Sequence, residues 1–187
     1  MNRYYKIGLL HKVKAHIKRG EVIAYPTESC YGLGCNPYDY KAINKIFKLK
    51  KRSKAKGFIV VAGGFKQLAR VIKPLTANEL SIAKRYWPGL YSLILKTKPN
   101  VPPNLTGKFK TVAIRVSAQK NIQQLCNWLN SSLVSTSANR AKQLSIKTYR
   151  ECVKRFGKST LVLPGLIGFA KKPSTIIDIA TNKIIRK

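Results

Sequence analysis

"AYPTESCYGLGCNP", residues 24–37, follows a short apolar run and indicates the class of fold. The apolar residues 22–25 predict a short buried strand that Pro26 closes. Two hydroxyl residues, Thr27 and Ser29, follow the strand, and α/β proteins bind ligands at such strand ends. Gly32 and Gly34 allow either a close approach of a ligand or a turn with positive φ. A binding loop and a simple turn therefore both remain open.

The apolar pattern on both sides of this stretch predicts interspersed helices and strands. A capping-box spacing, Thr76 with Glu79, opens one of the helices. The expected helices cover residues 9–17, 42–47, 76–86, 122–129 and 149–156, and Leu68 with Ile72 suggests another helical turn or two. The expected strands cover residues 22–25, 58–62, 90–95, 111–116, 132–135, 161–163 and 175–179. Only a proline-rich loop joins the strands at 90–95 and 111–116, so we expect an α/β fold with a mixed sheet, flanked by helices.

The composition fits one globular domain and gives no sign of a secreted or membrane-spanning protein. The 187 residues suit a single domain over 1–187, and 37 Lys and Arg against 6 acids give a net charge of +31. That excess favours a nucleic-acid partner, and a lysine-rich compositional bias is the alternative. No signal peptide or membrane-spanning stretch is recognisable, and the spacing of the four cysteines fits free thiols better than zinc ligands. We therefore expect a cytoplasmic protein.

Three further segments and one strand residue, Arg115, could bind a ligand. The run at 48–57 is either a solvated charged face or a clamp for polyphosphate. The sequence "STSAN", 135–139, places hydroxyl and amide groups after a strand, but a serine nucleophile needs a base, and His11 and His16 lie on an N-terminal helix. Arg115 stands in an apolar strand and needs a partner, which could be an ion pair or a substrate carboxylate. "PST", 173–175, puts a hydroxyl pair before a strand.

Together these blocks resemble the YrdC/TsaC family of threonylcarbamoyl-AMP synthases, especially its short bacterial form. The resemblance covers about residues 7–185 and rests on "AYPTESCYGLGCNP", "KLKKRSKAKGFIVVA", "RYWPGLYSLIL", "LTGKFKTVAIRVS", "LVSTSANRAKQLS" and "KPSTIID" in that order. It implies an open, twisted mixed sheet with a concave basic surface. It also implies a nucleotidyltransferase that forms L-threonylcarbamoyladenylate and pyrophosphate from L-threonine, bicarbonate or CO₂, and ATP.

The resemblance also implies roles for individual residues. Lys50 and Arg52 are the expected catalytic cations. The expected ATP-binding residues are Lys50, Arg52, Lys56, Thr111, Ser137, Asn139 and Ser174. The expected threonine-binding residues are Thr27, Arg115 and Ser135. Mg²⁺ is expected to arrive on the ATP phosphates, with no metal or organic cofactor bound by the protein itself.

The implied partners follow from the same likeness. TsaD, TsaB and TsaE proteins would pass the threonylcarbamoyl group to a tRNA adenosine, and the net charge adds an expected affinity for RNA. The alternative function is a non-catalytic module on the same fold that binds tRNA or double-stranded RNA. Two departures from the family pattern affect loops: Ser53 replaces a proline, and Ala141 with Lys142 replaces Ser-Gly.

Overall fold

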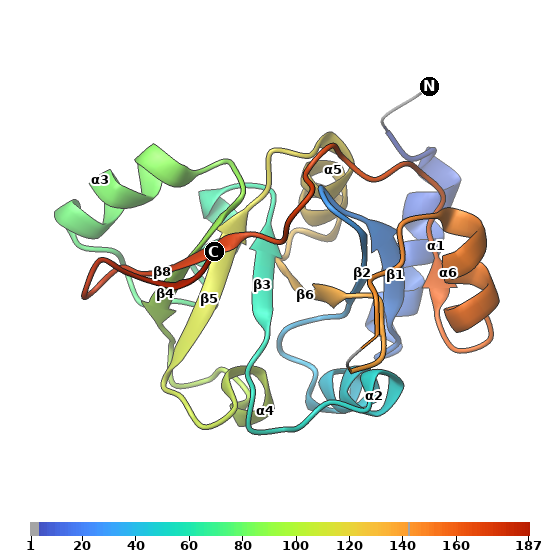
Figure 1. The fold of residues 1–187 in the computed structure, drawn as a ribbon, viewed down its shortest axis with the longest axis horizontal. Coiled ribbons are helices and arrows are strands. Elements are labelled where there is room, and N and C mark those ends of the chain that lie inside the picture. The colour runs from blue at the N-terminus through green and yellow to red at the C-terminus, as the bar shows by residue number, and fades with distance from the viewer. Residues whose placement is uncertain (1–3, 142) are drawn as a thin grey trace.

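A computed structural model describes residues 4–141 and 143–187, and its centre is an open, nine-stranded mixed sheet. The strand order is β7-β1-β2-β6-β3-β5-β4-β8-β9, so β7 and β9 form the two edges. Figure 1 shows the sheet twisting from β8 and β4 to β1. The strands are β1 (Ile23–Pro26), β2 (Tyr31–Gly34), β3 (Ile59–Ala62), β4 (Tyr91–Lys96), β5 (Thr111–Val116), β6 (Leu133–Ser137), β7 (Leu161–Val162), β8 (Thr175–Asp178) and β9 (Lys183–Arg186).

Both parallel and antiparallel pairs occur, which confirms the mixed sheet. The pairs β1–β7, β3–β5 and β4–β8 are parallel. The pairs β1–β2, β2–β6, β3–β6, β4–β5 and β8–β9 are antiparallel. The central strands read as apolar runs because both faces of the sheet contribute side chains to a core.

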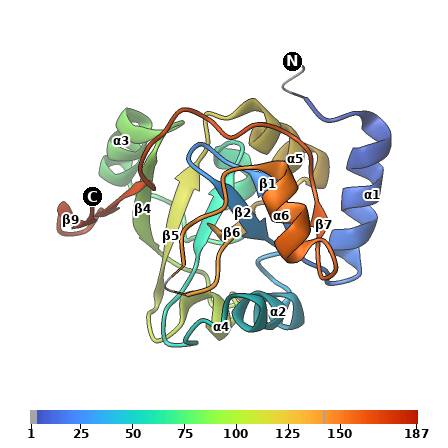
Figure 2. The same ribbon diagram turned by 45° about the vertical axis from the view of Figure 1, so that its right-hand side comes forward.

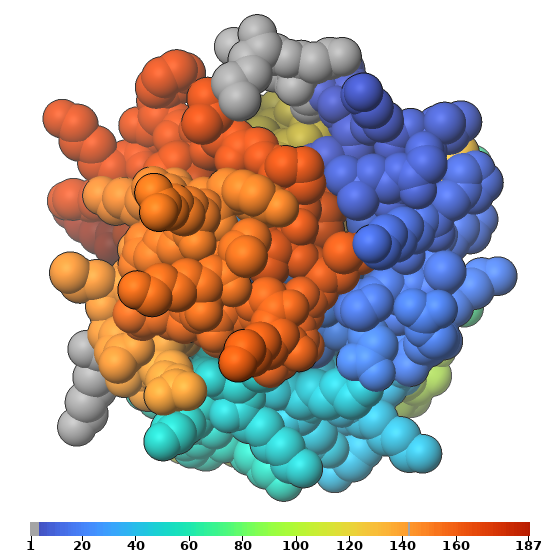
Figure 3. Space-filling view, turned by 90° about the vertical axis from the view of Figure 1, so that its right-hand side faces the viewer, coloured from blue at the N-terminus to red at the C-terminus, as the bar shows by residue number. Residues whose placement is uncertain are grey.

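The helices cover the sheet in two groups, as Figures 1 and 2 show. Side chains of α1 and α5 pack on one face with Ile23, Tyr25 and Val61. Side chains of α2, α3 and α6 pack on the other face in a larger core. Figure 3 shows α6 between α1 and α2 on one surface of the molecule. The helices are α1 (Ile7–Lys18), α2 (Tyr40–Lys50), α3 (Ala77–Tyr86), α4 (Pro103–Thr106), α5 (Lys120–Leu129) and α6 (Tyr149–Phe156), with a 3₁₀ turn, η1 (Phe65–Leu68).

Most of the expected elements are present, with local reasons that the sequence already carries. Gly20 follows α1 with a φ of 72°, as a helix stop requires. Thr76 accepts from the main-chain N–H of Glu79, and the Glu79 carboxylate accepts from that of Thr76, so the capping box is confirmed.

Three elements were not expected, namely β2, β9 and α4. Of the two alternatives for Gly32 and Gly34, the turn with positive φ is excluded, because Tyr31–Gly34 pairs with both β1 and β6. Glycine is rare in strands, so its presence at 32 and 34 hid the strand. The loop expected between β4 and β5 contains α4, a single helical turn that begins at Pro103.

Candidate functional site

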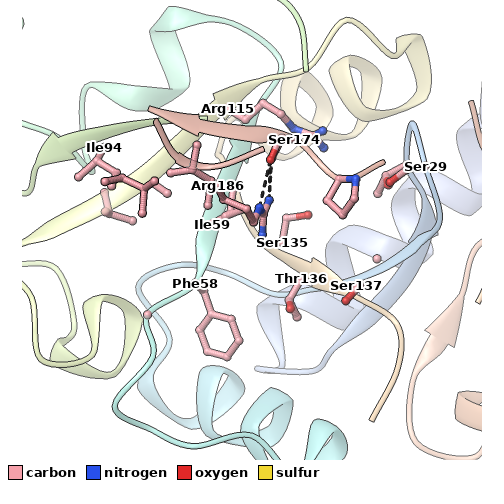
Figure 4. A pocket seen from close by; sticks show the side chains of 18 of the residues that line it. Ser29, Phe58, Ile59, Ile94, Arg115, Ser135, Thr136, Ser137, Ser174 and Arg186 are labelled. Atoms are coloured by element: carbon pink, nitrogen blue, oxygen red, sulfur yellow. Dashed lines mark hydrogen bonds between the residues drawn. The ribbon is translucent and has the colours of Figure 1, made fainter. Parts of the chain in front are cut away.

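A cavity of about 1160 Å³ opens at the centre of the sheet. Figure 4 shows side chains of β5, β6 and the segment before β8 facing the same space. The wall combines hydroxyl groups with several cations and apolar side chains. Its polar residues include Thr27, Ser29, Arg52, Thr111, Arg115, Ser135, Thr136, Ser137, Lys147, Lys171, Ser174 and Arg186.

Two of the wall hydroxyls, those of Thr27 and Ser135, are buried and held by neighbouring groups. The Thr27 hydroxyl donates to the main-chain oxygen of Cys30 at 2.8 Å. The Tyr25 hydroxyl donates to Ser135 Oγ at 3.0 Å, and burial raises the pKa of Tyr25, so this phenol stays protonated. Ser135 Oγ therefore accepts one hydrogen bond and keeps its own proton for a further acceptor.

Arg115 lies on β5 with its guanidinium group against Glu28. Arg115 Nη2 is 2.9 Å from Glu28 Oε2, and both side chains are nearly buried. The other carboxylate oxygen of Glu28 accepts from the Ser117 hydroxyl at 2.6 Å. Arg115 Nε is buried without a hydrogen-bond partner among the described residues. Of the two alternatives for Arg115, the structural ion pair is present, and Arg115 also lines the cavity, with guanidinium donors that Glu28 does not use.

Arg52 is fixed at the cavity wall by the segment that follows α2. Its Nη2 donates to the main-chain oxygen of Gly57 at 2.7 Å, and its guanidinium carbon lies 5.0 Å from the centroid of the Phe58 ring. Burial, and then the charge of Arg186, lowers the pKa of Arg52. The run at 48–57 is therefore not a uniformly solvated face.

Arg186 is a cavity cation that the sequence analysis missed. Its Nη2 donates to the main-chain oxygen of Ser174 at 2.7 Å and to Ser174 Oγ at 3.2 Å, as Figure 4 shows. Ser174 Oγ is also 2.8 Å from Ser92 Oγ. Arg186 is exposed as a whole residue, and partial burial of its guanidinium group, followed by the charge of Arg115, lowers its pKa. The signal available in the sequence was "TIIDIATNKII", 175–185, where Thr-Asn separates two short apolar runs. In the structure Asn182 forms the turn with a φ of 54°.

Lys50 lies beneath the 137–139 segment and does not face the cavity. Its Nζ donates to the main-chain oxygen of Ser137, to that of Asn139 at 2.8 Å and to Asn139 Oδ1 at 3.1 Å. Asn139 Oδ1 also accepts from the Ser137 hydroxyl at 2.6 Å. Burial, and then the charge of Arg52, lowers the pKa of Lys50 to about 8. The lysine thus joins the end of α2 to the end of β6.

The other expected site residues fall into two groups. Thr27, Arg52, Thr111, Arg115, Ser135, Ser137 and Ser174 line the cavity. Within the part of the chain that the structure describes, Lys50, Lys56 and Asn139 do not line it. Lys56 is exposed, and its backbone forms an isolated antiparallel β-bridge with Gly107. The altered loop contains Ala141 and Lys142. The main-chain N–H of Ala141 donates to the main-chain oxygen of Lys50 at 2.9 Å, and Lys142 lies outside the described residues.

Three other features restrict the chemistry. All four cysteines are buried free thiols. No group of three His, Cys, Asp or Glu side chains is arranged to hold a metal ion within residues 4–141 and 143–187. Over the same residues, no helix is long and apolar enough to cross a membrane.

Comparisons of the sequence and of the structure with known proteins identify the same family. The sequence profile of the Sua5/YciO/YrdC family (telomere recombination) matches residues 15–187. The threonylcarbamoyl-AMP synthase of Chromobacterium violaceum is 46% identical over 178 residues, which are 95% of this chain and 92% of that protein.

Two solved structures share the fold. P. abyssi Sua5 complexed with L-threonine matches with a TM-score of 0.84 and 30% identity, over 90% of this chain and 50% of that one. This chain therefore spans about half the length of that protein. E. coli YciO matches with a TM-score of 0.85 and 26% identity, over 97% of this chain and 90% of that one. The chain belongs to the Sua5/YciO/YrdC family.

Proposed function

We propose that this chain is a threonylcarbamoyl-AMP synthase, which forms L-threonylcarbamoyladenylate and pyrophosphate from L-threonine, bicarbonate or CO₂, and ATP. Two lines of support are the 46% identity to a protein of that name and the likeness to a Sua5 structure that holds L-threonine. The observation that carries the proposal is the cavity wall, where buried hydroxyls and three arginine side chains meet.

The chemistry of this reaction fits a wall without a catalytic base. The neutral amine of threonine adds to CO₂ and gives a carbamate and a proton, or it condenses with bicarbonate and gives the same carbamate and water. A carbamate oxygen then attacks the α-phosphorus of ATP, and the bond to the bridging oxygen of pyrophosphate breaks. Neither step needs a protein nucleophile, so the protein's task is positioning, charge neutralisation and exclusion of water. No histidine of the described residues lines the cavity, which disfavours a covalent serine mechanism.

The threonine end of the site is assigned to the wall around Arg115. We expect the free donors of Arg115 to bind the carboxylate of threonine while Glu28 keeps the guanidinium group oriented. Thr27 and Ser135 lie on the same wall and are expected to contact the rest of the amino acid. Ser135 is suited to donate, because its acceptor side is already used by Tyr25.

The nucleotide end is assigned to the wall that carries Arg52 and Arg186. The charges of Arg52, Arg186 and Arg115 oppose one another, and a polyphosphate would relieve that repulsion. Arg52 is held by Gly57 and Arg186 by Ser174, so little rearrangement is needed to bind an anion. We keep Lys56, Thr111, Ser137, Asn139 and Ser174 as expected contacts of ATP. Mg²⁺ is proposed to enter with ATP, bound by the phosphates as part of the substrate.

Lys50 is proposed to act through the 137–139 segment. Its ammonium group binds the main chain of Ser137 and Asn139, and Ser137 lines the cavity. Loss of Lys50 would therefore misplace a nucleotide contact even though the lysine itself lies behind the wall.

The decisive experiment measures product. The purified protein is incubated with ATP, threonine and bicarbonate, pyrophosphate is assayed, and the adenylate is sought by mass spectrometry. We expect pyrophosphate release that depends on both threonine and bicarbonate. Pyrophosphate release that is indifferent to either one would rule out the proposed reaction.

Affinity for RNA and transfer to partner proteins are proposed as additional properties. The net charge of +31 supports a contact with phosphate backbones. The test is to measure the affinity for tRNA between about 50 and 200 mM salt. If the protein contacts several phosphates, the higher salt concentration should weaken binding by orders of magnitude. A salt-independent affinity would contradict it. TsaD, TsaB and TsaE proteins are the proposed recipients of the adenylate, and a tRNA-modifying role would place the chain in the cytoplasm.

A further inference from the structure

Gly32 occupies a position in β2 where the backbone does not require glycine. It pairs with Tyr25 on one side and with Ser137 on the other, as any strand residue could. Its φ is not in the left-handed region that favours glycine. The reason for a glycine at this position therefore lies in the space that a side chain would occupy.

That space belongs to the cavity. A Cβ atom at Gly32 would lie 3.0 Å from Thr27 Cγ2, 3.5 Å from the main-chain oxygen of Thr136 and 3.7 Å from Ser135 Oγ. Gly32, Thr27, Thr136 and Ser135 all line the cavity. The Thr27 methyl group has little freedom to move away, because the hydroxyl of the same side chain is bound to the Cys30 oxygen at 2.8 Å. The missing side chain thus leaves a small hollow in the wall.

Gly34, two residues along the same strand, provides the contrast. A Cβ atom there would lie 2.6 Å from the main-chain oxygen of Val134 and 2.8 Å from Tyr25 Cε1. Gly34 does not line the cavity, and Tyr25 is fully buried. Core packing therefore explains the glycine at 34. The contacts at Gly32 are with cavity groups, so a ligand explains that glycine better than packing does.

The groups around the hollow are complementary to the side chain of a small β-hydroxy amino acid. One border is apolar, the Thr27 methyl group, and another is the Ser135 hydroxyl, whose proton is free to donate. Threonine carries one methyl and one hydroxyl on its β-carbon. We propose that Gly32 sets the size limit for the amino-acid side chain, with the Thr27 methyl and the Ser135 hydroxyl on its borders. This inference rests on the proposed function and names the specificity determinant of the same site.

The first test narrows the hollow with Gly32→Ala. Rates of pyrophosphate release are measured with threonine, serine and glycine, at saturating ATP and bicarbonate, and the adenylates are identified by mass spectrometry. We expect the ratio of kcat/KM for threonine to that for serine to fall about tenfold, since one methyl group in a pocket is worth about 10- to 200-fold. A folded Gly32→Ala variant with the wild-type ratio would overturn the inference.

The second test widens the same hollow and does not depend on Gly32→Ala folding. Thr27→Ser removes the bordering methyl group and keeps the hydroxyl that binds the Cys30 oxygen. Its selectivity should move toward isoleucine, whose side chain is one methylene longer than that of the isosteric valine, and an unchanged ratio of isoleucine to threonine would also overturn the inference. Wild-type turnover with threonine tests the proposed function separately. If wild type makes no adenylate, calorimetric binding of threonine, serine and isoleucine to the three proteins still tests the size limit.

Discussion

Replacing Lys50 with methionine removes the link between α2 and the 137–139 segment, and its cost can be worked out oxygen by oxygen. The Ser137 oxygen keeps a hydrogen bond from the Asn139 N–H at 2.9 Å. Asn139 Oδ1 keeps the Ser137 hydroxyl at 2.6 Å. Only the main-chain oxygen of Asn139 loses its sole donor among the described residues. An orphaned buried acceptor costs about 1–3 kcal/mol. Asn139 is half-buried and partly open to water, so we expect this orphaned acceptor to contribute about 1–2 kcal/mol to the cost.

The effect of Lys50→Met on stability should depend on pH. Burial lowers the pKa of Lys50 in the folded protein from 10.5 to about 8. Between these two pH values the unfolded chain holds more protons than the folded one, so the stability contributed by Lys50 rises with pH. Methionine does not titrate. The stability gap between wild type and Lys50→Met should therefore widen from pH 8 to pH 10, by about 1 kcal/mol per pH unit, below the limit of about 1.4.

The assay is urea unfolding of wild type and Lys50→Met at pH 7, 8, 9 and 10. The general loss of positive charge at high pH affects both proteins equally and cancels in the difference. Lys48→Met is the matched control, because Lys48 is exposed on the same helix. We expect Lys48→Met to change stability by less than about 0.5 kcal/mol. A gap for Lys50→Met that stays constant or narrows with rising pH would refute the assignment of a buried, destabilised ammonium group.

Two further predictions concern the cavity and the core. Arg186→Ala should lower kcat/KM for ATP about 100-fold, by analogy with loss of one donor to transition-state charge. Arg186→Lys should recover part of it, Lys183→Ala on the same exposed strand serves as control, and less than a twofold loss in Arg186→Ala would remove Arg186 from the nucleotide end. Gly34→Ala should destabilise the fold by about 1–3 kcal/mol, because its Cβ would lie 2.6 Å from the Val134 oxygen. Urea unfolding of the variant checks this, and wild-type stability would contradict the packing explanation.

Local patterns in the sequence determined the class of fold and most of its elements. The α1 stop at Gly20 and the capping box at Thr76 depend on residues within a few positions of each other, so the sequence alone reveals them. The apolar strands predicted a covered sheet, and a loop between two of them predicted its mixed directions. The blocks that resemble one family also contain most of the hydroxyl residues that line the cavity.

Tertiary structure decided what pairing between distant strands controls. The strand at 31–34 was missed because its glycines have low strand propensity and only neighbours on β1 and β6 make it a strand. Arg186 reaches the cavity only because β9 pairs with β8. The Lys50 contacts with Ser137 and Asn139 join residues 87 and 89 positions apart, and no local pattern encodes such a contact. Spacing along the chain predicts which groups a segment carries, whereas burial and register decide which of them face the cavity.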